Sequence, residues 1–270
     1  MSKDSLELSA YSKTALITGA SSGIGYELAK LFAADGYQLV LVARNMKNLE
    51  RAAGELKTGF NRSVKLIAKD MSDSKAPQEI SAQLKNEGIK VDVLVNNAGF
   101  GLHGAFVDTS IDTEMNMLDV NVANVVRLTK LLLPDMIKQR SGAILNMASV
   151  AAFKPGPFMA MYYASKAFIV SFSEALAGEL AGTGVEVSVL CPGPTATGFQ
   201  KRAGIKNTLL IRGNMMTAEY TAKIGYRGLK EKKLLVVPGI KNKVLALGFR
   251  YLPPAWSIAF VRLMQDTFKE

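Results

Sequence analysis

Short apolar runs alternate with longer stretches of helical periodicity along most of this sequence. Seven runs have the length and composition of buried strands: Thr14–Thr18, Gln38–Ala43, Val64–Ala68, Val91–Val95, Ala143–Met147, Val185–Leu190 and Leu234–Val237. The helical stretches between them are Gly25–Ala34, Met46–Lys57, Pro77–Asn86, Thr113–Gln139, Ala160–Ala181 and Thr217–Glu231. This alternation predicts an α/β fold, doubly wound, in which about seven parallel strands carry helices on both faces. Pro134 is expected to bend or end its helix near Leu133.

The composition is typical of one packed unit. Hydrophobic residues make up 49% and charged residues 21% of the 270 positions, as in a folded globular chain. No repeat or linker interrupts the pattern, so we expect a single domain over residues 1–270. From Pro192 to Asn214 the pattern dissolves into glycine, proline, threonine and lysine, which predicts a mobile loop over a site. Residues 194–232 would then form a substrate loop and a lid helix.

Residue counts and charge limit the chemistry. There is one cysteine, Cys191, and one histidine, His103, so a disulfide framework, a Cys/His zinc site and paired-histidine catalysis are excluded, and we expect no metal ion. The first residues carry acids and no apolar run, which favours a cytoplasmic protein. The formal charge of +10 suits a phosphorylated cofactor or an anionic membrane. No nucleic-acid-binding signature accompanies the lysines and arginines, so we expect no nucleic acid partner.

A glycine-rich turn follows the first predicted strand. The segment Thr18-Gly-Ala-Ser-Ser-Gly-Ile-Gly25 leads directly into a helix, where a pyrophosphate can approach the backbone N–H groups of the helix N-terminus. Such turns also occur without a ligand, so the position after the first strand carries the interpretation. The second strand is followed by Arg44, where an acid would bind the adenosine ribose; an arginine there can pair with a 2′-phosphate. This favours NADPH over NADH, unless Arg44 is only a solvated strand end.

Tyr162 and Lys166 are four residues apart in a predicted helix and therefore share one of its faces. A lysine ammonium beside a phenol favours the phenolate and lowers its pKa, so Tyr162 is expected to act as an acid or base near neutral pH. Ser149 follows a strand directly and can donate a hydrogen bond to the same substrate oxygen. A tyrosine and a lysine at this spacing are common on helix surfaces, so the interpretation depends on the conjunction of all these motifs.

In these motifs the chain resembles the short-chain dehydrogenase/reductase family over nearly its whole length. The resemblance rests on Thr18-Gly-Ala-Ser-Ser-Gly-Ile-Gly25, Asn96-Asn-Ala-Gly99, Asn121, Ser149, Tyr162-x-x-x-Lys166 and Cys191-Pro-Gly-Pro-Thr195. It implies a Rossmann fold and a catalytic tetrad of Asn121, Ser149, Tyr162 and Lys166. In the family the tyrosine exchanges a proton with the substrate oxygen and the serine orients that oxygen. The lysine also holds the nicotinamide ribose, and the asparagine bends its helix and anchors a water.

The same resemblance implies a set of residues that bind NADP(H). They are Gly19, Ser21, Ser22, Gly23, Ile24, Gly25, Arg44, Asp70, Met71, Asn97, Ala98, Gly99, Tyr162, Lys166, Pro192, Gly193, Thr195 and Thr197. Asp70 matches the family's adenine contact, and Arg44 matches its NADP-preferring branch. That branch often has a second basic residue in the glycine turn, where this chain has Ser22, so the preference for NADPH is expected to be incomplete. Tyr163 is adjacent to Tyr162 but lacks the four-residue spacing to Lys166.

The substrate side is expected to be apolar. Candidate residues are Phe100, Leu102, His103, Ala151, Phe153, Pro157, Met159 and the loop from Phe199 to Met216. This composition favours a hydrophobic, lipid-like carbonyl or alcohol, such as a 3-oxoacyl chain or another ketone or aldehyde, over a sugar phosphate. His103 has no catalytic partner in the sequence and is assigned no role.

Residues 238–270 predict a basic, amphipathic C-terminal extension of two short helices split at Pro253 and Pro254. Such an extension can lie on an anionic membrane surface, pack over the substrate mouth or pack against a second subunit. A weaker resemblance to relatives that act on lipid-like ketones favours a cap over a long apolar substrate, with peripheral membrane contact as a further expectation.

Two other functions are weighed against the oxidoreductase. One is a catalytically silent NADP(H)-binding regulatory protein, which tight binding of NADPH without turnover would support. The other is an epimerase or dehydratase of the family's extended branch, which spaces its phosphate glycines differently and carries a longer substrate domain. The resemblance also implies a homodimer or homotetramer built from the Thr113–Gln139 and Ala160–Ala181 helices.

Overall fold

A parallel β-sheet forms the centre of the molecule. The structure is a computed structural model that describes residues 13–205, 215–251 and 253–265. The strands of the sheet are β1 (Thr14–Thr18), β2 (Gln38–Ala43), β3 (Val64–Ala68), β4 (Val93–Asn96), β5 (Gly142–Met147), β6 (Val185–Leu190) and β9 (Leu235–Val236). They are hydrogen-bonded in the order β3-β2-β1-β4-β5-β6-β9, and every neighbouring pair is parallel. The predicted seven-stranded parallel sheet is confirmed.

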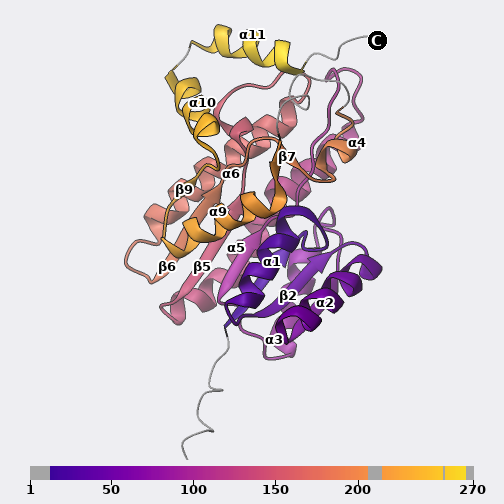
Figure 1. Cartoon of the computed structure of the whole chain (residues 1–270), viewed down its shortest axis with the longest axis vertical. Coiled ribbons are helices and arrows are strands. Elements are labelled where there is room, and N and C mark those ends of the chain that lie inside the picture. The colour runs from indigo at the N-terminus through magenta and orange to yellow at the C-terminus, as the bar shows by residue number, and fades with distance from the viewer. Residues whose placement is uncertain (1–12, 206–214, 252, 266–270) are drawn as a thin grey trace, which may run out of the picture.

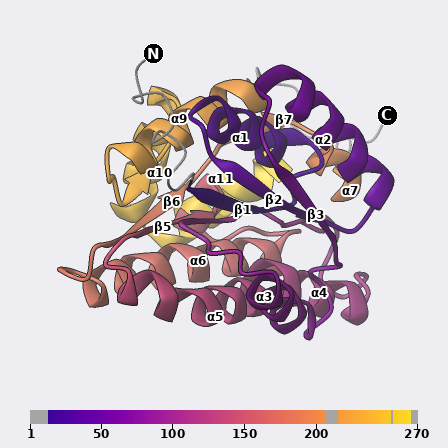
Figure 2. The same cartoon turned by 90° about the horizontal axis from the view of Figure 1, so that it is seen from below.

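Helices cover both faces of this sheet (Figure 2). One layer holds α1 (Gly23–Ala34), α2 (Met46–Phe60) and α9 (Ala218–Lys230), and the other holds α3 (Ala76–Asn86), α5 (Asn124–Lys138) and α6 (Ala160–Glu179). Successive side chains of a strand point to opposite faces, so Ala15 and Ile17 join one buried cluster and Leu16 joins the other. Because both clusters are apolar, the strands lack the polar alternation of a half-exposed sheet.

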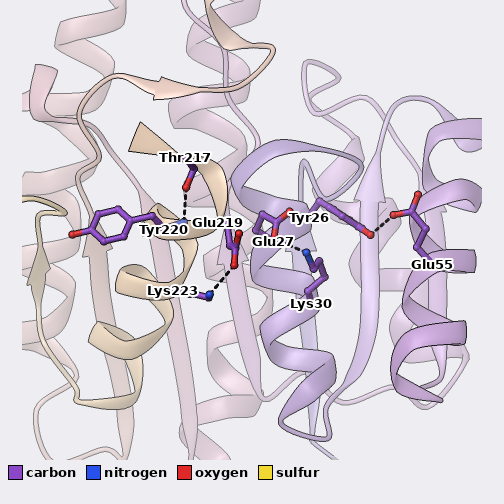
Figure 3. A network of polar contacts seen from close by, with 8 residues as sticks. All are labelled: Tyr26, Glu27, Lys30, Glu55, Thr217, Glu219, Tyr220 and Lys223. Carbon is purple, nitrogen blue, oxygen red and sulfur yellow. Dashed lines mark hydrogen bonds and ion pairs between the residues drawn. The ribbon is translucent and has the colours of Figure 1, made fainter. Parts of the chain in front are cut away.

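Polar contacts on the surface of the first helix layer link α1 to α2 and pair charged residues within α9 (Figure 3). The phenol of Tyr26 in α1 donates a hydrogen bond to the carboxylate of Glu55 in α2. Within α9, the Lys223 ammonium lies 2.7 Å from the Glu219 carboxylate. Exposed ion pairs of this kind contribute at most about 1 kcal/mol, so the apolar cluster beneath them holds the layer on the sheet.

The helical stretch predicted for Thr113–Gln139 is divided into three parts. α4 (Ile111–Leu118) is followed by a π-helical turn, Asp119–Ala123, and then by α5. A π-turn places one extra residue in a helical turn and shifts the register of the next helical segment. Asn121 lies in this turn, so the irregularity falls on a residue that the sequence had marked as functional.

Pro134 does not end its helix. α5 continues through it to Lys138, so of the two expected outcomes an end near Leu133 is wrong, and a bend there stays a prediction. An internal proline costs a helix about 3 kcal/mol, because it removes one backbone hydrogen bond. The flanking side chains of Leu132 and Met136 are buried in the core, and their packing against the sheet offsets this cost.

The order of the strands places a crevice at one edge of the sheet. The chain first builds β1, β2 and β3 outward in one direction and then adds β4, β5 and β6 on the other side of β1. In doubly wound sheets, ligands bind beyond the carboxyl ends of the strands beside such a reversal. The segments that follow β1, β4, β5 and β6 here are the glycine turn, the Asn97–Gly99 segment, Ser149 and the loop that begins at Pro192.

The segment after β6 has more regular structure than a mobile loop. β7 (Thr195–Ala196) pairs in parallel with β8 (Met216–Thr217), and α7 (Phe199–Arg202) lies between them in the sequence. Residues 206–214 of the predicted loop lie outside the described residues. The described part of this segment is therefore anchored to a second, two-stranded sheet.

The C-terminal extension forms two helices, α10 (Ile240–Tyr251) and α11 (Pro254–Gln265), as the sequence predicted. They lie together at one end of the molecule (Figure 1). Val261 of α11 is buried in an apolar cluster that also contains Tyr162 and Met159. The extension is thus packed beside the residues singled out as catalytic. Within the described ranges, no helix combines the length and hydropathy that a membrane crossing needs.

Candidate active site

The glycine turn between β1 and α1 is shaped by contacts to the segment after β4. The side-chain amide of Asn97 donates hydrogen bonds to the carbonyls of Thr18 (2.9 Å) and Gly19 (3.2 Å). Gly19 has a φ of +66°, and a Cβ at Gly25 would lie 2.4 Å from the Asn97 amide nitrogen. Ser22, the N-cap of α1, makes no side-chain capping bond, and the first turn of α1 has no acidic residue. The N–H groups at this helix end therefore suit an anion.

The segment after β4 connects this turn to the catalytic candidates. The Thr18 hydroxyl accepts hydrogen bonds from the backbone N–H groups of Asn97 and Ala98, both at 3.0 Å. A Cβ at Gly99 would lie 3.0 Å from the Asn121 amide oxygen and 3.4 Å from the Lys166 nitrogen. Glycine at this position therefore lets the backbone of the segment after β4 lie directly against two members of the expected tetrad.

Asn121 holds its place through three hydrogen bonds. Its amide oxygen accepts from the backbone N–H of Phe100 (3.1 Å), and its amide nitrogen donates to the Phe100 carbonyl (2.9 Å) and to the Ser165 hydroxyl (3.2 Å). The side chain is 1% exposed. These contacts fix the π-turn against both the segment after β4 and α6.

Tyr162, Ser149 and Lys166 lie together beyond β5. Tyr162 and Lys166 are both buried on α6, and the Lys166 nitrogen lies 5.8 Å from the centre of the Tyr162 ring. The Lys166 ammonium donates to the carbonyl of Met147 at 2.9 Å, the last residue of β5. The Tyr162 hydroxyl is hydrogen-bonded to Ser149. The structure thus brings the three side chains into one site.

The pKa of Tyr162 is shifted in the direction opposite to the one expected from its spacing to Lys166. Burial of the Tyr162 phenol raises its pKa, and the smaller effect of the hydrogen bond with Ser149 lowers it. Burial also lowers the pKa of Lys166 to about 8. The spacing in the sequence reveals only the attraction between a Tyr162 phenolate and the Lys166 ammonium. The cost of burying the charged phenolate inside the protein has the larger effect on the pKa of Tyr162. A protonated Tyr162 suits the role of a proton donor.

A cavity of about 630 Å³ lies over these residues, a volume in the usual range for small-molecule sites. Every cofactor-binding candidate from the sequence lines it except Gly25, which lies behind the turn against Asn97. Ser149, Tyr162 and Lys166 line it as well, and Asn121 lies behind Gly99. The candidates therefore surround one continuous space.

Several polar residues in the cavity wall were not singled out from the sequence. They are Asn45, Asn48, Lys69, Ser72, Thr113, Asn116, Lys154 and Gln265; Gln200 and Arg202, which also line the cavity, belong to the expected loop from Phe199 to Met216. Asn45, Lys69 and Ser72 directly adjoin named candidates in the sequence, so their proximity to the strand ends was a usable signal; Asn48 lies four residues after Arg44, in α2. Lys154 and Gln265 reach the cavity only through tertiary packing.

Arg44 and Arg202 both line the cavity. The Arg44 guanidinium lies 3.7 Å from the Asp70 carboxylate in an exposed pair. Burial lowers the pKa of Arg202, and the positive charge of Arg44 lowers it further. Among the ion pairs of the described residues, none includes Arg202. Two like charges are thus held close together in the wall of the cavity.

The apolar wall agrees only in part with the substrate residues expected from the sequence. Phe100, Ala151, Met159 and Phe199 line the cavity. The other named candidates, Leu102, His103, Phe153 and Pro157, do not line it. The ring nitrogen Nε2 of His103 is hydrogen-bonded to the Gln265 carbonyl at 3.1 Å. His103 therefore helps to hold the C-terminal helix.

Tyr163 has surroundings unlike those of Tyr162. Its hydroxyl accepts a hydrogen bond from the Gln265 side chain at 2.8 Å. Its ring packs so closely on Gly156 that a Cβ there would lie 2.2 Å from it. Burial raises the pKa of Tyr163, while the bond with Gln265 acts against this. The phenol of Tyr163 therefore makes a structural contact with α11.

Comparison with known proteins assigns the chain to a family. The family model described as short chain dehydrogenase matches residues 13–207, which is more than half of the chain. The chain therefore belongs to the short-chain dehydrogenase family.

Two curated relatives are a short chain dehydrogenase of Pseudocercospora fijiensis, 40% identical over 183 residues, and the ketoacyl reductase HetN of Nostoc sp., 35% identical over 181 residues. Each match covers 67% of this chain. The matches cover 59% of the Pseudocercospora protein and 63% of HetN, so this chain spans less than two thirds of the length of both.

Two similar solved structures contain different cofactors. A short-chain dehydrogenase from Sphingobium yanoikuyae in complex with NADPH is 30% identical, with a TM-score of 0.80 over 86% of this chain and 90% of that one. A dehydrogenase/reductase from Burkholderia phymatum in complex with NAD is 28% identical, with a TM-score of 0.79 over 96% of this chain and 98% of that one. The choice between the two cofactors therefore depends on this chain's own residues.

Proposed function

We propose that this protein reduces the carbonyl group of a hydrophobic substrate with NADPH and that Tyr162 donates the proton. The observation that carries the proposal is the buried Tyr162 phenol, hydrogen-bonded to Ser149 and adjacent to Lys166, in the wall of a single dinucleotide-sized cavity. A buried, protonated phenol is a suitable general acid for an oxygen that gains negative charge.

The residues present fit a nicotinamide dinucleotide. The uncapped N-terminus of α1, behind the glycine turn, can accept the pyrophosphate. Gly99 has no side chain that would occupy the space beside Lys166. The Lys166 ammonium points from α6 toward the end of β5, where a ribose can reach it. Pro192, Gly193 and Thr195 also line the cavity. NADP(H) would thus be held along the carboxyl edge of the sheet.

In the proposed reaction, the dinucleotide supplies a hydride to the carbonyl carbon. The hydroxyl groups of Ser149 and Tyr162 bind the carbonyl oxygen and orient it. The Tyr162 phenol transfers its proton to that oxygen as negative charge develops there. The nearby Lys166 ammonium stabilises the phenolate that is left behind. Asn121 keeps α6 and the Gly99 segment in register for these contacts.

The pH dependence of the reduction follows from Lys166. Its pKa is lowered to about 8 by burial, so the ammonium is present below this pH and is lost above it. We expect kcat/KM for ketone reduction to be constant up to about pH 7 and to fall by up to about tenfold for each pH unit above about 8. Steady-state kinetics from pH 6 to pH 10 would measure this.

Lys154 provides the matched control for this profile. It lines the same cavity, and burial lowers its pKa to about 8 as well. Lys154→Met should keep the falling limb, because it leaves Lys166, one helical turn from Tyr162 on α6, unchanged. A limb that disappears in Lys154→Met, or a wild-type profile that stays flat to pH 10, would contradict the assignment to Lys166.

Arg44 and Arg202 support the choice of NADPH. Two guanidinium groups in one cavity wall repel each other, and a 2′-phosphate between them would relieve this repulsion. Arg202 would thereby supply the second positive charge that the glycine turn lacks at Ser22. This pair favours NADPH at the adenosine end of the cavity.

Substitution of these arginines should change the cofactor preference. We expect Arg44→Asp to lower the ratio of kcat/KM with NADPH to kcat/KM with NADH by about tenfold to a hundredfold, and Arg202→Ala to lower it by several-fold, since one charge-assisted bond contributes about 1.5–3 kcal/mol. Lys201→Ala, on the same short helix but outside the cavity wall, should leave the ratio unchanged. Ratios that respond to neither arginine would refute the 2′-phosphate site.

A hydrophobic ketone is the proposed substrate class because the wall next to Tyr162 carries Phe100, Met159 and Phe199. The relative HetN is a ketoacyl reductase, which supports a 3-oxoacyl chain as one example. The test is consumption of NADPH with ketones and aldehydes of graded chain length. Activity that rises with chain length would support the proposal. Tight NADPH binding without turnover of any of them would instead support the regulatory alternative.

We also propose that the protein is cytoplasmic, that it forms an oligomer and that it contacts the membrane surface peripherally. Phe168 of α6 is 44% exposed and stacks on Phe172, which provides an apolar patch for a second copy of the chain. On α11, Trp256 and Leu263 are exposed beside the basic Arg262, which suits an anionic lipid surface. Sedimentation of Phe168→Glu and flotation of Trp256→Gln with anionic vesicles would test the two surfaces separately.

A further inference from the structure

Gln265 brings a polar side chain from the end of α11 into the catalytic cavity. It is 1% exposed and lines the cavity with Met159 and Tyr163, about a hundred residues earlier in the chain. Its backbone carbonyl is hydrogen-bonded to His103, and Val261, one helical turn earlier, is buried beside Tyr162. α11 therefore holds Gln265 in a fixed place.

The two ends of the Gln265 amide differ in their contacts. The nitrogen lies 2.8 Å from the Tyr163 hydroxyl and 3.4 Å from the Met159 sulfur. A thioether sulfur can only accept, so the NH₂ group is the end that faces it. The amide oxygen is buried and has no hydrogen-bond partner in the part of the chain that the structure describes. A buried acceptor without a donor is uncommon in proteins and costs free energy.

The other residues that line this cavity suggest what the amide oxygen of Gln265 can bind. Ala151, Phe199 and Ile205, which belong to one apolar cluster with Met159, also line the cavity. In the proposed reaction, the substrate's carbonyl oxygen is bound by Ser149 and Tyr162. A second polar group on the substrate would therefore meet Gln265, and because the free atom of Gln265 is an acceptor, that group must be a donor.

We propose that the amide oxygen of Gln265 accepts a hydrogen bond from the substrate. The substrate class is then a hydrophobic ketone that carries a hydroxyl or N–H group at a distance from its carbonyl. This proposal rests on the proposed reductase function and narrows its substrate. Sites built to bind a substrate donor discriminate strongly against analogues that lack it, because the buried acceptor is then left unpaired.

The test uses matched sets of ketones. Straight-chain methyl ketones of increasing length are each compared with their ω-hydroxy and ω-methoxy counterparts, which differ in the presence of a donor. We expect the wild-type protein to favour the ω-hydroxy over the ω-methoxy ketone by about tenfold or more in kcat/KM at the chain length that reaches Gln265, with the difference mainly in KM. The alcohol products, titrated into the NADP-bound protein by calorimetry, should show the same preference.

Three variants show whether Gln265 causes the preference. Gln265→Met removes the acceptor and should bring the ratio close to one. Gln265→Glu keeps an acceptor and should keep most of the ratio. Trp256→Gln changes an exposed residue of the same helix and should leave the ratio unchanged.

The outcomes separate the inference from the function on which it rests. Turnover of the plain ketones without an ω-hydroxy preference at any length, or a preference that survives in Gln265→Met, overturns the role of Gln265 and leaves the reductase proposal intact. Failure of every ketone to consume NADPH overturns both.

Discussion

Replacing Tyr162 by phenylalanine should reduce carbonyl turnover by about 10²- to 10⁴-fold, the usual contribution of a positioned general acid. The change removes one oxygen atom and leaves the ring packed against Phe199 and near Lys166. Binding of NADPH should persist, because the turn at Gly19 and the segment at Asn97 are untouched. Steady-state kinetics with a plain hydrophobic ketone, together with NADPH titration by fluorescence, would measure both quantities.

Tyr163→Phe is the matched control. It also removes one phenolic oxygen from the cavity wall, but the phenol of Tyr163 is bonded to Gln265 rather than to Ser149. It should keep most of the turnover with a plain ketone. If Tyr163→Phe were inactive and Tyr162→Phe active, the roles assigned to the two tyrosines would have to be exchanged.

Lys166→Met should cause the second large loss, a fall in kcat/KM of about a hundredfold or more, since both the charge beside the phenol and a ribose contact disappear. The side chain is 4% exposed, and its ammonium donates a hydrogen bond to the carbonyl of Met147. Methionine has a similar length and no charge to bury, so the melting temperature should change little or rise. Kinetics and thermal unfolding on the same preparation would separate these effects.

The combination of low activity and preserved stability is what identifies a chemical role for Lys166. A variant that loses activity only because it unfolds would show that the ammonium is needed for the fold. A variant that keeps wild-type turnover would show that the charge is not needed beside Tyr162.

Much of the fold could be predicted because the strands are buried on both faces. The centres of β1 and β2, residues 15–17 and 39–42, consist wholly of buried apolar residues, which distinguishes these strands from the amphipathic helices between them. The resemblance implied that Asn121 bends its helix but not that the bend is a π-turn, and the choice between an end and a continuation of α5 at Pro134 was left open. Both depend on packing against the sheet, which local sequence does not reveal.

The candidate site was predictable where motifs follow strand ends. Ser149 and Asn97 are adjacent in sequence to the strands that place them, so their meeting follows from the parallel sheet. Arg202 and Gln265 come from α7 and α11, whose positions depend on tertiary contacts. The direction of the pKa shift of Tyr162 also could not be predicted, because spacing to Lys166 reports a neighbouring charge but not the degree of burial.

The most direct test of the proposed reaction follows a deuterium label from NADPH into the product. NADPH deuterated at C4 of the nicotinamide, on the transferred side, is incubated with a long-chain ketone, and the alcohol is examined by mass spectrometry. We expect one deuterium on the carbinol carbon with the wild-type protein and labelled alcohol to form about 10²- to 10⁴-fold more slowly with Tyr162→Phe, although both proteins bind NADPH. Product without deuterium, or equal labelled product from both proteins, would contradict hydride transfer assisted by Tyr162.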